Sequence, residues 1–186
     1  MAIAYLNPAA AVTNSNWDSS TVSELDQGET SNTWQTTANN ADLKVTLDDF
    51  DNTGVSSITS VQLILVGNYD SRSGSWIANT EIQNSGGTAL YSENLTVPAG
   101  RTASTLSGTV RTTSDGSTAW TDSDLDGMRI KVFSLNCTTK GQLVQFYIKV
   151  TYSTGYGHEV TNVASTNIAK VSGVATANIA KVIGVD

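Results

Sequence analysis

Apolar and polar residues alternate along three stretches of the chain. In 41–50, Leu43, Val45 and Leu47 share one face, opposite Lys44 and Thr46. The same period recurs in 127–135 and 142–152, where the apolar face carries Met128, Ile130 and Val132, and then Val144, Phe146, Ile148 and Val150. A period of two is that of a strand with one buried face. We therefore expect these segments to be strands that pack over a common core.

Further strands are predicted by composition and by the turns between them. The segment 60–69, SVQLILVGNY, is apolar almost throughout, which predicts a strand covered on both faces. Segments 75–83, 88–97 and 104–113 lie between turns rich in Asp, Asn, Ser and Gly. Residues 21–27 offer one helical turn at most. About eight strands predict an all-β fold, a β-sandwich of the jelly-roll type over residues 1–154, with an up-and-down barrel as the alternative.

Charge narrows the range of partners. The chain has 17 acidic and 10 basic residues, a net charge of -7 and a pI near 4.5. Nucleic acid is bound mainly through Lys and Arg on phosphates, so we expect no nucleic acid partner. We also expect no membrane partner, because the acidic chain would be repelled by an anionic surface and carries no apolar stretch of transmembrane length.

The N-terminus and the cysteine content indicate the cellular compartment in which the protein folds. Cys137 is the only cysteine, so no internal disulfide forms. The first 17 residues, MAIAYLNPAAAVTNSNW, contain no basic segment and no long apolar run of the kind found in signal peptides. Both features are typical of a protein that folds in a reducing cytoplasm.

Catalytic chemistry finds little support in the sequence. His158 is the only histidine and lies in the segment 153–159, STGYGHE, which we interpret as a hinge. A catalytic triad would depend on this residue, and a zinc site built on His158 and Cys137 would lack ligands. Pairs of carboxylates for glycoside hydrolysis remain open, but no pair stands out. We expect no catalytic residues and a protein that is not an enzyme.

One acidic motif matches the start of a calcium loop. Asp122, Asp124 and Asp126 fit Asp-x-Asp-x-Asp-Gly, in which carboxylates converge on a hard cation. The EF-hand form needs Glu at loop position 12, where this chain has Phe133. The alternative is an acidic turn that leads into the strand at Met128. We expect no cofactor, with calcium at these three residues as the one candidate.

Aromatic residues raise the possibility of carbohydrate binding, because sugars stack on exposed rings. Tyr69 and Trp76 flank the polar segment 70–75, DSRSGS, and are the candidates for exposed rings. The alternative is that the tryptophans fill the core of the sandwich.

The C-terminal region contains a tandem repeat. NIAKVSGV at 167–174 returns as NIAKVIGV at 178–185, an offset of 11 residues. Each copy predicts a short strand and a Gly turn, which is too small to bury its own apolar residues. We therefore expect the tail, residues 155–186, to contact other subunits, unless it folds back on its own domain. The expected contact residues are Ile168, Lys170, Val171, Val174, Ile179, Lys181, Val182 and Val185.

This repeat resembles the IAKVNGV-type repeats that end many structural proteins of tailed bacteriophages. The stretch 119–136, AWTDSDLDGMRIKVFSLN, also resembles a recurrent piece of phage virion proteins. Ser172 and Ile183 stand where Asn is common in the repeats. The resemblance implies a non-enzymatic virion protein, a capsid decoration or head-fibre component that is assembled in the host cytoplasm. Its implied partners are copies of itself and the major capsid or tail protein. A carbohydrate-binding or host-adhesion module, such as a tail component, is the alternative.

Overall fold

The computed structural model describes residues 1–18, 22–28, 34–36, 39–70, 75–100, 102–137, 140–155, 170–171 and 174–175. The strands up to residue 155 are β1 (Ala2–Leu6), β2 (Pro8–Ser15), β3 (Trp34–Thr36), β4 (Asp42–Leu47), β5 (Val55–Asp70), β6 (Ser75–Gln83), β7 (Ala89–Pro98), β8 (Ser104–Ser107), β9 (Arg129–Leu135) and β10 (Lys140–Thr154). Two helical turns, η1 (Val22–Leu25) and α1 (Asp122–Leu125), join them. The short η1 agrees with the single turn expected in 21–27.

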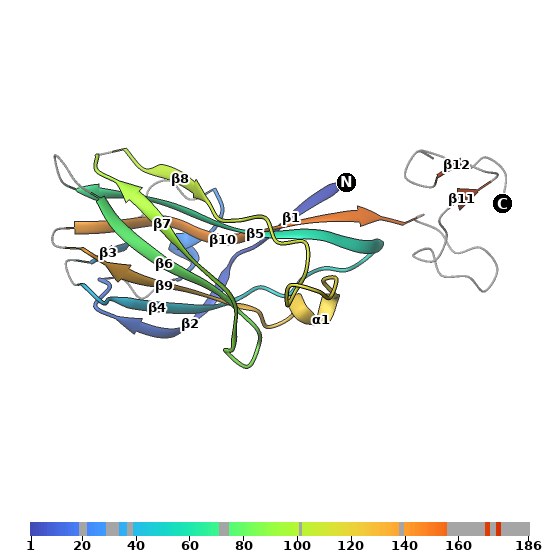
Figure 1. Cartoon of the computed structure of the whole chain (residues 1–186), viewed down its shortest axis with the longest axis horizontal. Coiled ribbons are helices and arrows are strands. Elements are labelled where there is room, and N and C mark those ends of the chain that lie inside the picture. Colours follow the sequence, from blue (N-terminus) through green and yellow to red (C-terminus); the bar gives the residue numbers. More distant parts are fainter. Residues whose placement is uncertain are drawn as a thin grey trace.

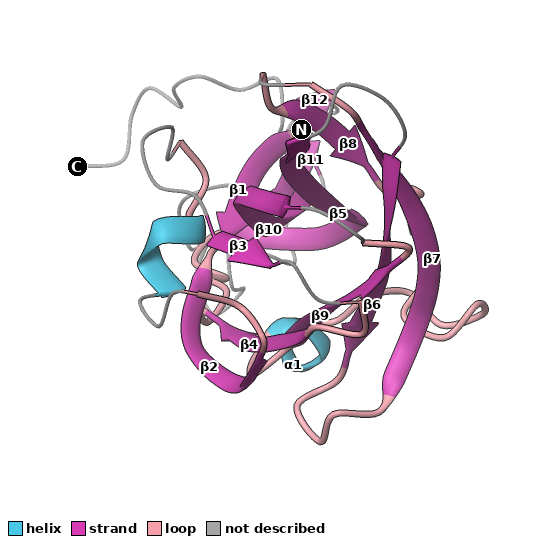
Figure 2. Cartoon of the chain, turned by 90° about the vertical axis from the view of Figure 1, so that its left-hand side faces the viewer, coloured by secondary structure: helices cyan, strands magenta, loops and turns pink. Residues whose placement is uncertain are grey.

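The strands form two antiparallel sheets (Figures 1 and 2). Sheet A has the order β1-β10-β5-β8, with β3 also paired to β10, and sheet B has the order β2-β4-β9-β6-β7. The chain changes sheet at every step except the hairpin from β6 to β7. This alternation is that of a jelly roll, and no ladder of the described strands joins the sheets into a barrel. The predicted β-sandwich is therefore confirmed.

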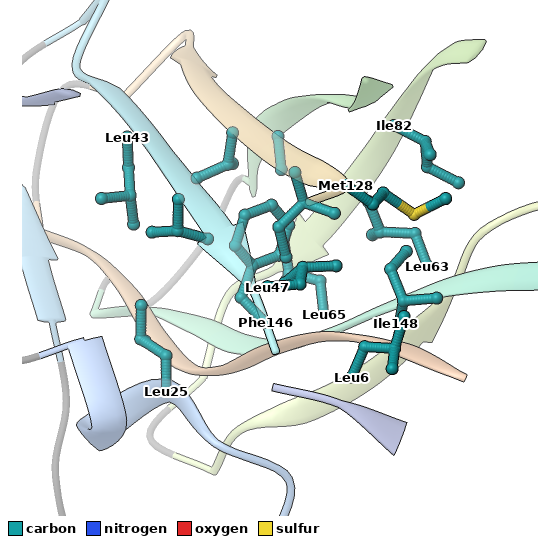
Figure 3. Packing of buried hydrophobic residues seen from close by; sticks show 14 of the residues in the cluster. Leu6, Leu25, Leu43, Leu47, Leu63, Leu65, Ile82, Met128, Phe146 and Ile148 are labelled. Atoms are coloured by element: carbon teal, nitrogen blue, oxygen red, sulfur yellow. The ribbon is translucent and has the colours of Figure 1, made fainter. Parts of the chain in front are cut away.

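The core lies between the sheets and is built by the alternation seen in the sequence. β4 and β9 bury every second residue, and their inward side chains include Leu43, Val45, Ile130 and Val132. Figure 3 shows labelled residues from both sheets meeting there, among them Leu63, Met128 and Phe146 in the described core. Complete burial of one such side chain contributes about 1.5–3 kcal/mol.

A bulge in β10 shifts one predicted position. The pairing of β10 with β5 changes register between Leu143 and Gln145. Leu143 joins the core together with Phe146, Ile148 and Val150, whereas Val144 is buried outside that cluster. An extra residue in a strand breaks the period of two, so Leu143 takes the inward position predicted for Val144, and the predicted inward face resumes at Phe146.

Strand β5 partly confirms the prediction of burial on both faces. Leu63 and Leu65 point into the core, and Ile64, on the opposite face, is also buried. Ile64 lies beside Tyr147 of β10 on the outer surface of sheet A. None of the helices in the described part of the chain is long and apolar enough to span a membrane.

Candidate functional site

The two rings expected to be exposed are buried, and this expectation is wrong. Trp76 is fully buried and Tyr69 nearly so. The Trp76 indole nitrogen donates a hydrogen bond to the carbonyl oxygen of Asn68 at 3.2 Å, and its ring meets that of Trp17 edge-on at 6.1 Å. Both rings therefore fill the core, as in the alternative, because a residue beside a polar loop can still point inward from its strand. The side chain of Trp34 lies outside the described residues.

The acidic motif at 122–126 forms the helical turn α1. Asp124 accepts hydrogen bonds from the backbone nitrogen and hydroxyl of Thr121, at 2.8 and 2.7 Å, and so caps α1. Asp122 accepts one from the side chain of Asn52 at 2.9 Å. Among the described residues, no group of three His, Cys, Asp or Glu side chains is placed to hold a metal ion. Hydrogen bonds within the protein thus engage the carboxylates of Asp122 and Asp124, and calcium binding at this motif stays a prediction.

Other surface carboxylates are also used by turns. Hydrogen bonds from Thr118 and Ser117 hold the pKa of Asp115 far below its usual value. Hydrogen bonds from Thr53 likewise lower the pKa of Asp51. Turns that bind their own carboxylates in this way are common between strands.

Of the two residues considered for catalysis, Cys137 and His158, the structure describes only Cys137. Cys137 is buried, and this burial raises the pKa of its thiol. A raised pKa keeps the thiol protonated near neutral pH, where it is a poor nucleophile. His158 lies outside the described residues.

The tail is described only in part. β11 (Lys170–Val171) and β12 (Val174–Ala175) pair with each other as antiparallel strands within and just after the first repeat copy. Two residues, 172 and 173, separate them in the sequence. Ile168, Ile179, Lys181, Val182 and Val185 lie outside the described residues, as do the side chains of Lys170, Val171 and Val174.

The outer surface of sheet B gathers side chains that the sequence did not single out. In one row across the sheet, Asp42 of β4 lies opposite Phe133 of β9, which lies opposite Asn79 of β6 and then Asn94 of β7. In the next row, Lys44 lies opposite Lys131, which lies opposite Glu81. We call this surface the polar face and define it by Asp42, Lys44, Asn79, Glu81, Asn94, Arg129, Lys131 and Phe133.

Contacts on the polar face hold several of its groups in place. The Asn79 side-chain amide donates to the Asn94 side-chain oxygen at 2.8 Å. The Lys131 ammonium lies 3.8 Å from a Glu81 carboxylate oxygen and 5.6 Å from the centre of the Phe133 ring. Asn94 is exposed, and the other residues of the polar face are half-buried. Phe133 lies on β9, the central strand of sheet B, with hydrogen-bonding groups on both sides.

Such a surface suits a ligand that is both apolar and rich in hydroxyl groups. An aromatic ring offers a flat apolar face, and amides, carboxylates and ammonium groups donate and accept hydrogen bonds around it. A pyranose has the matching character, since its C–H groups form an apolar face and its hydroxyls lie at the rim. The polar face is therefore the candidate functional site.

Sheet A offers a second surface with an exposed ring. Tyr5 is 41% exposed and packs edge-on against Tyr147 at 5.6 Å. Burial and the neighbouring Tyr5 raise the pKa of Tyr147. Ile3, also exposed, shares the outward side of β1 with Tyr5. This surface has fewer charged and amide groups near its ring than the polar face.

Sequence reasoning missed the polar face because its members come from four strands. The available signal was the polar side of the alternating segments, which carries Lys44, Lys131 and Phe133. Their alignment depends on strand order and register, which are set by long-range pairing.

No protein-family model and no curated protein matches the chain. Solved structures that are similar to it include two from bacteria. The C-terminal CBM6 of LamC, a marine laminarinase from Zobellia galactanivorans, has a TM-score of 0.47 and 14% identity, over 81% of this chain and 99% of that one. CBM35 from Paenibacillus barcinonensis has a TM-score of 0.42 and 16% identity, over 82% of this chain and 100% of that one. Likeness at this level assigns neither a family nor a ligand to the chain.

Proposed function

We propose that this protein is a non-catalytic glycan-binding module that holds a saccharide on the polar face of sheet B. The observation that carries the proposal is the position of Phe133, an outward ring at the centre of the sheet. Asp42 and Asn79 flank that ring in the same row. The proposal adopts the carbohydrate-binding or host-adhesion alternative that the sequence raised. It places the site on the polar face and not at Tyr69 and Trp76.

Both the Phe133 ring and the polar groups around it would contribute to the free energy of binding. Stacking on Phe133 removes the apolar side of a sugar from water, and the planar groups of Asp42 and Asn79 select the orientation of its hydroxyls. The Asn79–Asn94 hydrogen bond fixes the Asn79 amide before the ligand arrives, which lowers the entropy lost on binding.

The test is to replace the ring and to measure glycan binding. The full-length protein is screened by affinity electrophoresis against soluble neutral and acidic polysaccharides, and retained polymers are titrated by calorimetry. Phe133→Ala should weaken binding about tenfold, corresponding to ~1.4 kcal/mol. Tyr5→Ala is the matched control, since it removes the exposed ring of the opposite sheet and should leave affinity unchanged.

Two outcomes contradict the proposal. Retention of no polysaccharide by the folded wild type would reject glycan binding. Loss of binding in Tyr5→Ala with normal binding in Phe133→Ala would assign the ligand to sheet A. Thermal melting of each variant shows whether the sandwich is intact.

As a second proposal, the chain is a virion structural component, a capsid decoration or head-fibre protein held by contacts between subunits. It is supported by the tandem repeat and by the pairing of β11 with β12 in the tail. A ribbon of two such short strands is not stable in water by itself and requires a partner surface. The two proposals are compatible, since an adhesion module of a particle needs both a glycan site and an anchor.

A further inference from the structure

Of the basic side chains that the structure describes, most lie on the polar face. The structure describes the side chains of five of its ten Lys and Arg residues. Arg111 lies over the Tyr91 ring, 4.4 Å from its centre, and Lys149 is on the outer side of sheet A. The other three, Lys44, Arg129 and Lys131, all lie on the outer side of sheet B.

Their positions bring like charges together. Lys44 and Lys131 are directly opposite each other on β4 and β9, and Arg129 follows Lys131 on the same side of β9. Directly opposed residues have Cβ atoms about 4.5–5.5 Å apart, and like charges in that arrangement are destabilising. The surface thus carries a local repulsion that a bound anion would relieve.

The neighbouring carboxylates compensate only part of this charge. Glu81 is paired with Lys131, whereas Lys44 has no ion pair within the described residues. Asp42 lies two residues from Lys44 on the same side of β4, and the hydroxyl residue Thr13 faces Lys44 from β2. The polar face has three basic side chains and two carboxylates, those of Asp42 and Glu81. Its net charge is therefore positive, although the chain as a whole has a net charge of -7.

Arg129 adds a group suited to oxyanions. Its Nε is buried and has no hydrogen-bond partner among the described residues. A Cβ at Gly87 would lie 2.9 Å from the Arg129 guanidinium, so the absence of a side chain at Gly87 leaves room for this group. Guanidinium groups bind carboxylate and sulfate oxygens in a planar, paired geometry, and a lysine adds a point charge.

We infer that the saccharide held on the polar face is acidic and that Lys44, Arg129 and Lys131 receive its carboxylate or sulfate group. This inference rests on the proposed function and narrows its ligand to uronate-containing or sulfated glycans. The acidic group sits over the row of Lys44 and Lys131, and the sugar ring that bears it or the next one lies on Phe133 in the adjacent row.

The experiment compares three polymers and two variants of the full-length chain. The probes are polygalacturonate, dextran sulfate and neutral dextran, each measured by affinity electrophoresis at two salt concentrations. Lys44→Gln should weaken binding to the acidic polymer about five- to tenfold and reduce the salt dependence, because salt screens the lost interaction. Lys149→Gln changes the net charge equally on the opposite sheet and should leave binding unchanged.

The outcomes separate this inference from the proposed function. The inference is supported if the wild type binds polygalacturonate or dextran sulfate and Lys44→Gln, but not Lys149→Gln, loses that binding. Binding to polygalacturonate would identify the acidic group as a carboxylate, and binding to dextran sulfate would identify it as a sulfate. Binding to neutral glycans with no binding to either acidic polymer overturns the inference and leaves the proposed function standing. Equal weakening in Lys44→Gln and Lys149→Gln also overturns it, because attraction would then follow net charge. Absence of any glycan binding rejects both.

Discussion

At the scale of single residues, Gly67 shows how closely two long strands approach each other. A side chain on Gly67 of β5 would overlap the backbone carbonyl oxygen of Gln142 on β10. The contact lies next to the bulge between Leu143 and Gln145, where β10 changes register. A backbone oxygen cannot move aside as a flexible side chain does, so this position requires glycine.

Replacing this glycine tests the packing of the two strands. Gly67→Ala should lower the free energy of unfolding by about 1–3 kcal/mol, the usual cost of overpacking. Urea denaturation measures the change. Ser60→Ala, on the outer side of the same strand, is the control and should stay within about 0.5 kcal/mol of the wild type. Stability of Gly67→Ala equal to that of the control would mean that the strands do not approach in this way.

The burial of individual residues was predictable where the alternation is regular. Elsewhere the prediction of burial failed. Leu43, Val45 and Leu47 are buried as expected because β4 keeps an unbroken alternation and is covered on one side. Tyr69 and Trp76 were misjudged from the polar loop between them. A neighbouring loop gives no information on the face to which a strand residue points.

At the scale of elements, strands with one apolar side were easier to predict than the mostly exposed strand β2. β4, β9 and β10 have one apolar side and therefore a clear period of two. β2 forms an edge of sheet B, and most of its residues are exposed, including Ala9, Ala10, Ala11 and Val12. No alternation marks such a strand, so the N-terminal strands were not predicted from sequence.

The helical turn α1 offers a test of the acidic motif. Asp124→Ala removes the acceptor for the backbone nitrogen and hydroxyl of Thr121, and should cost about 1 kcal/mol of stability, as for other N-terminal caps. Asp126→Ala, at the exposed end of the turn, is the control. Urea denaturation in calcium and in EDTA should give equal midpoints for the wild type. If calcium raised the stability of the wild type strongly and Asp124→Ala abolished this effect, the motif would be a calcium site.

At the scale of the whole molecule, the fold class followed from the sequence, whereas the surface proposed to bind a ligand did not. Many short alternating segments, frequent turns and the lack of helical periodicity predict a β-sandwich without knowledge of strand order. The polar face depends on that order, because Lys44, Lys131 and Phe133 become neighbours only when β4 pairs with β9. The proposed glycan site therefore depends on residues that are distant in sequence and adjacent in register.

The proposed role of the tail, to hold the chain in an assembly, can be tested by deletion. The last strand of the sandwich ends at Thr154, before both copies of the repeat. Two equivalent copies on one tether can dock weakly at two equivalent sites and together hold strongly. Deleting residues 175–186 should therefore strongly reduce self-association or incorporation into a particle, measured by sedimentation velocity, while the calorimetric melting temperature of the sandwich changes little.

A chain in which residues 175–186 are present in scrambled order separates specific docking from general apolarity. Specific docking predicts that the scrambled chain associates as poorly as the truncated one, since composition is kept and the repeat is lost. Normal association of the truncated protein would reject the subunit contact. A fall of many degrees in its melting temperature that is the same at all protein concentrations would show instead that the repeat packs on its own sandwich. A contact between subunits would stabilise the fold more at higher protein concentration, whereas an intramolecular contact would not.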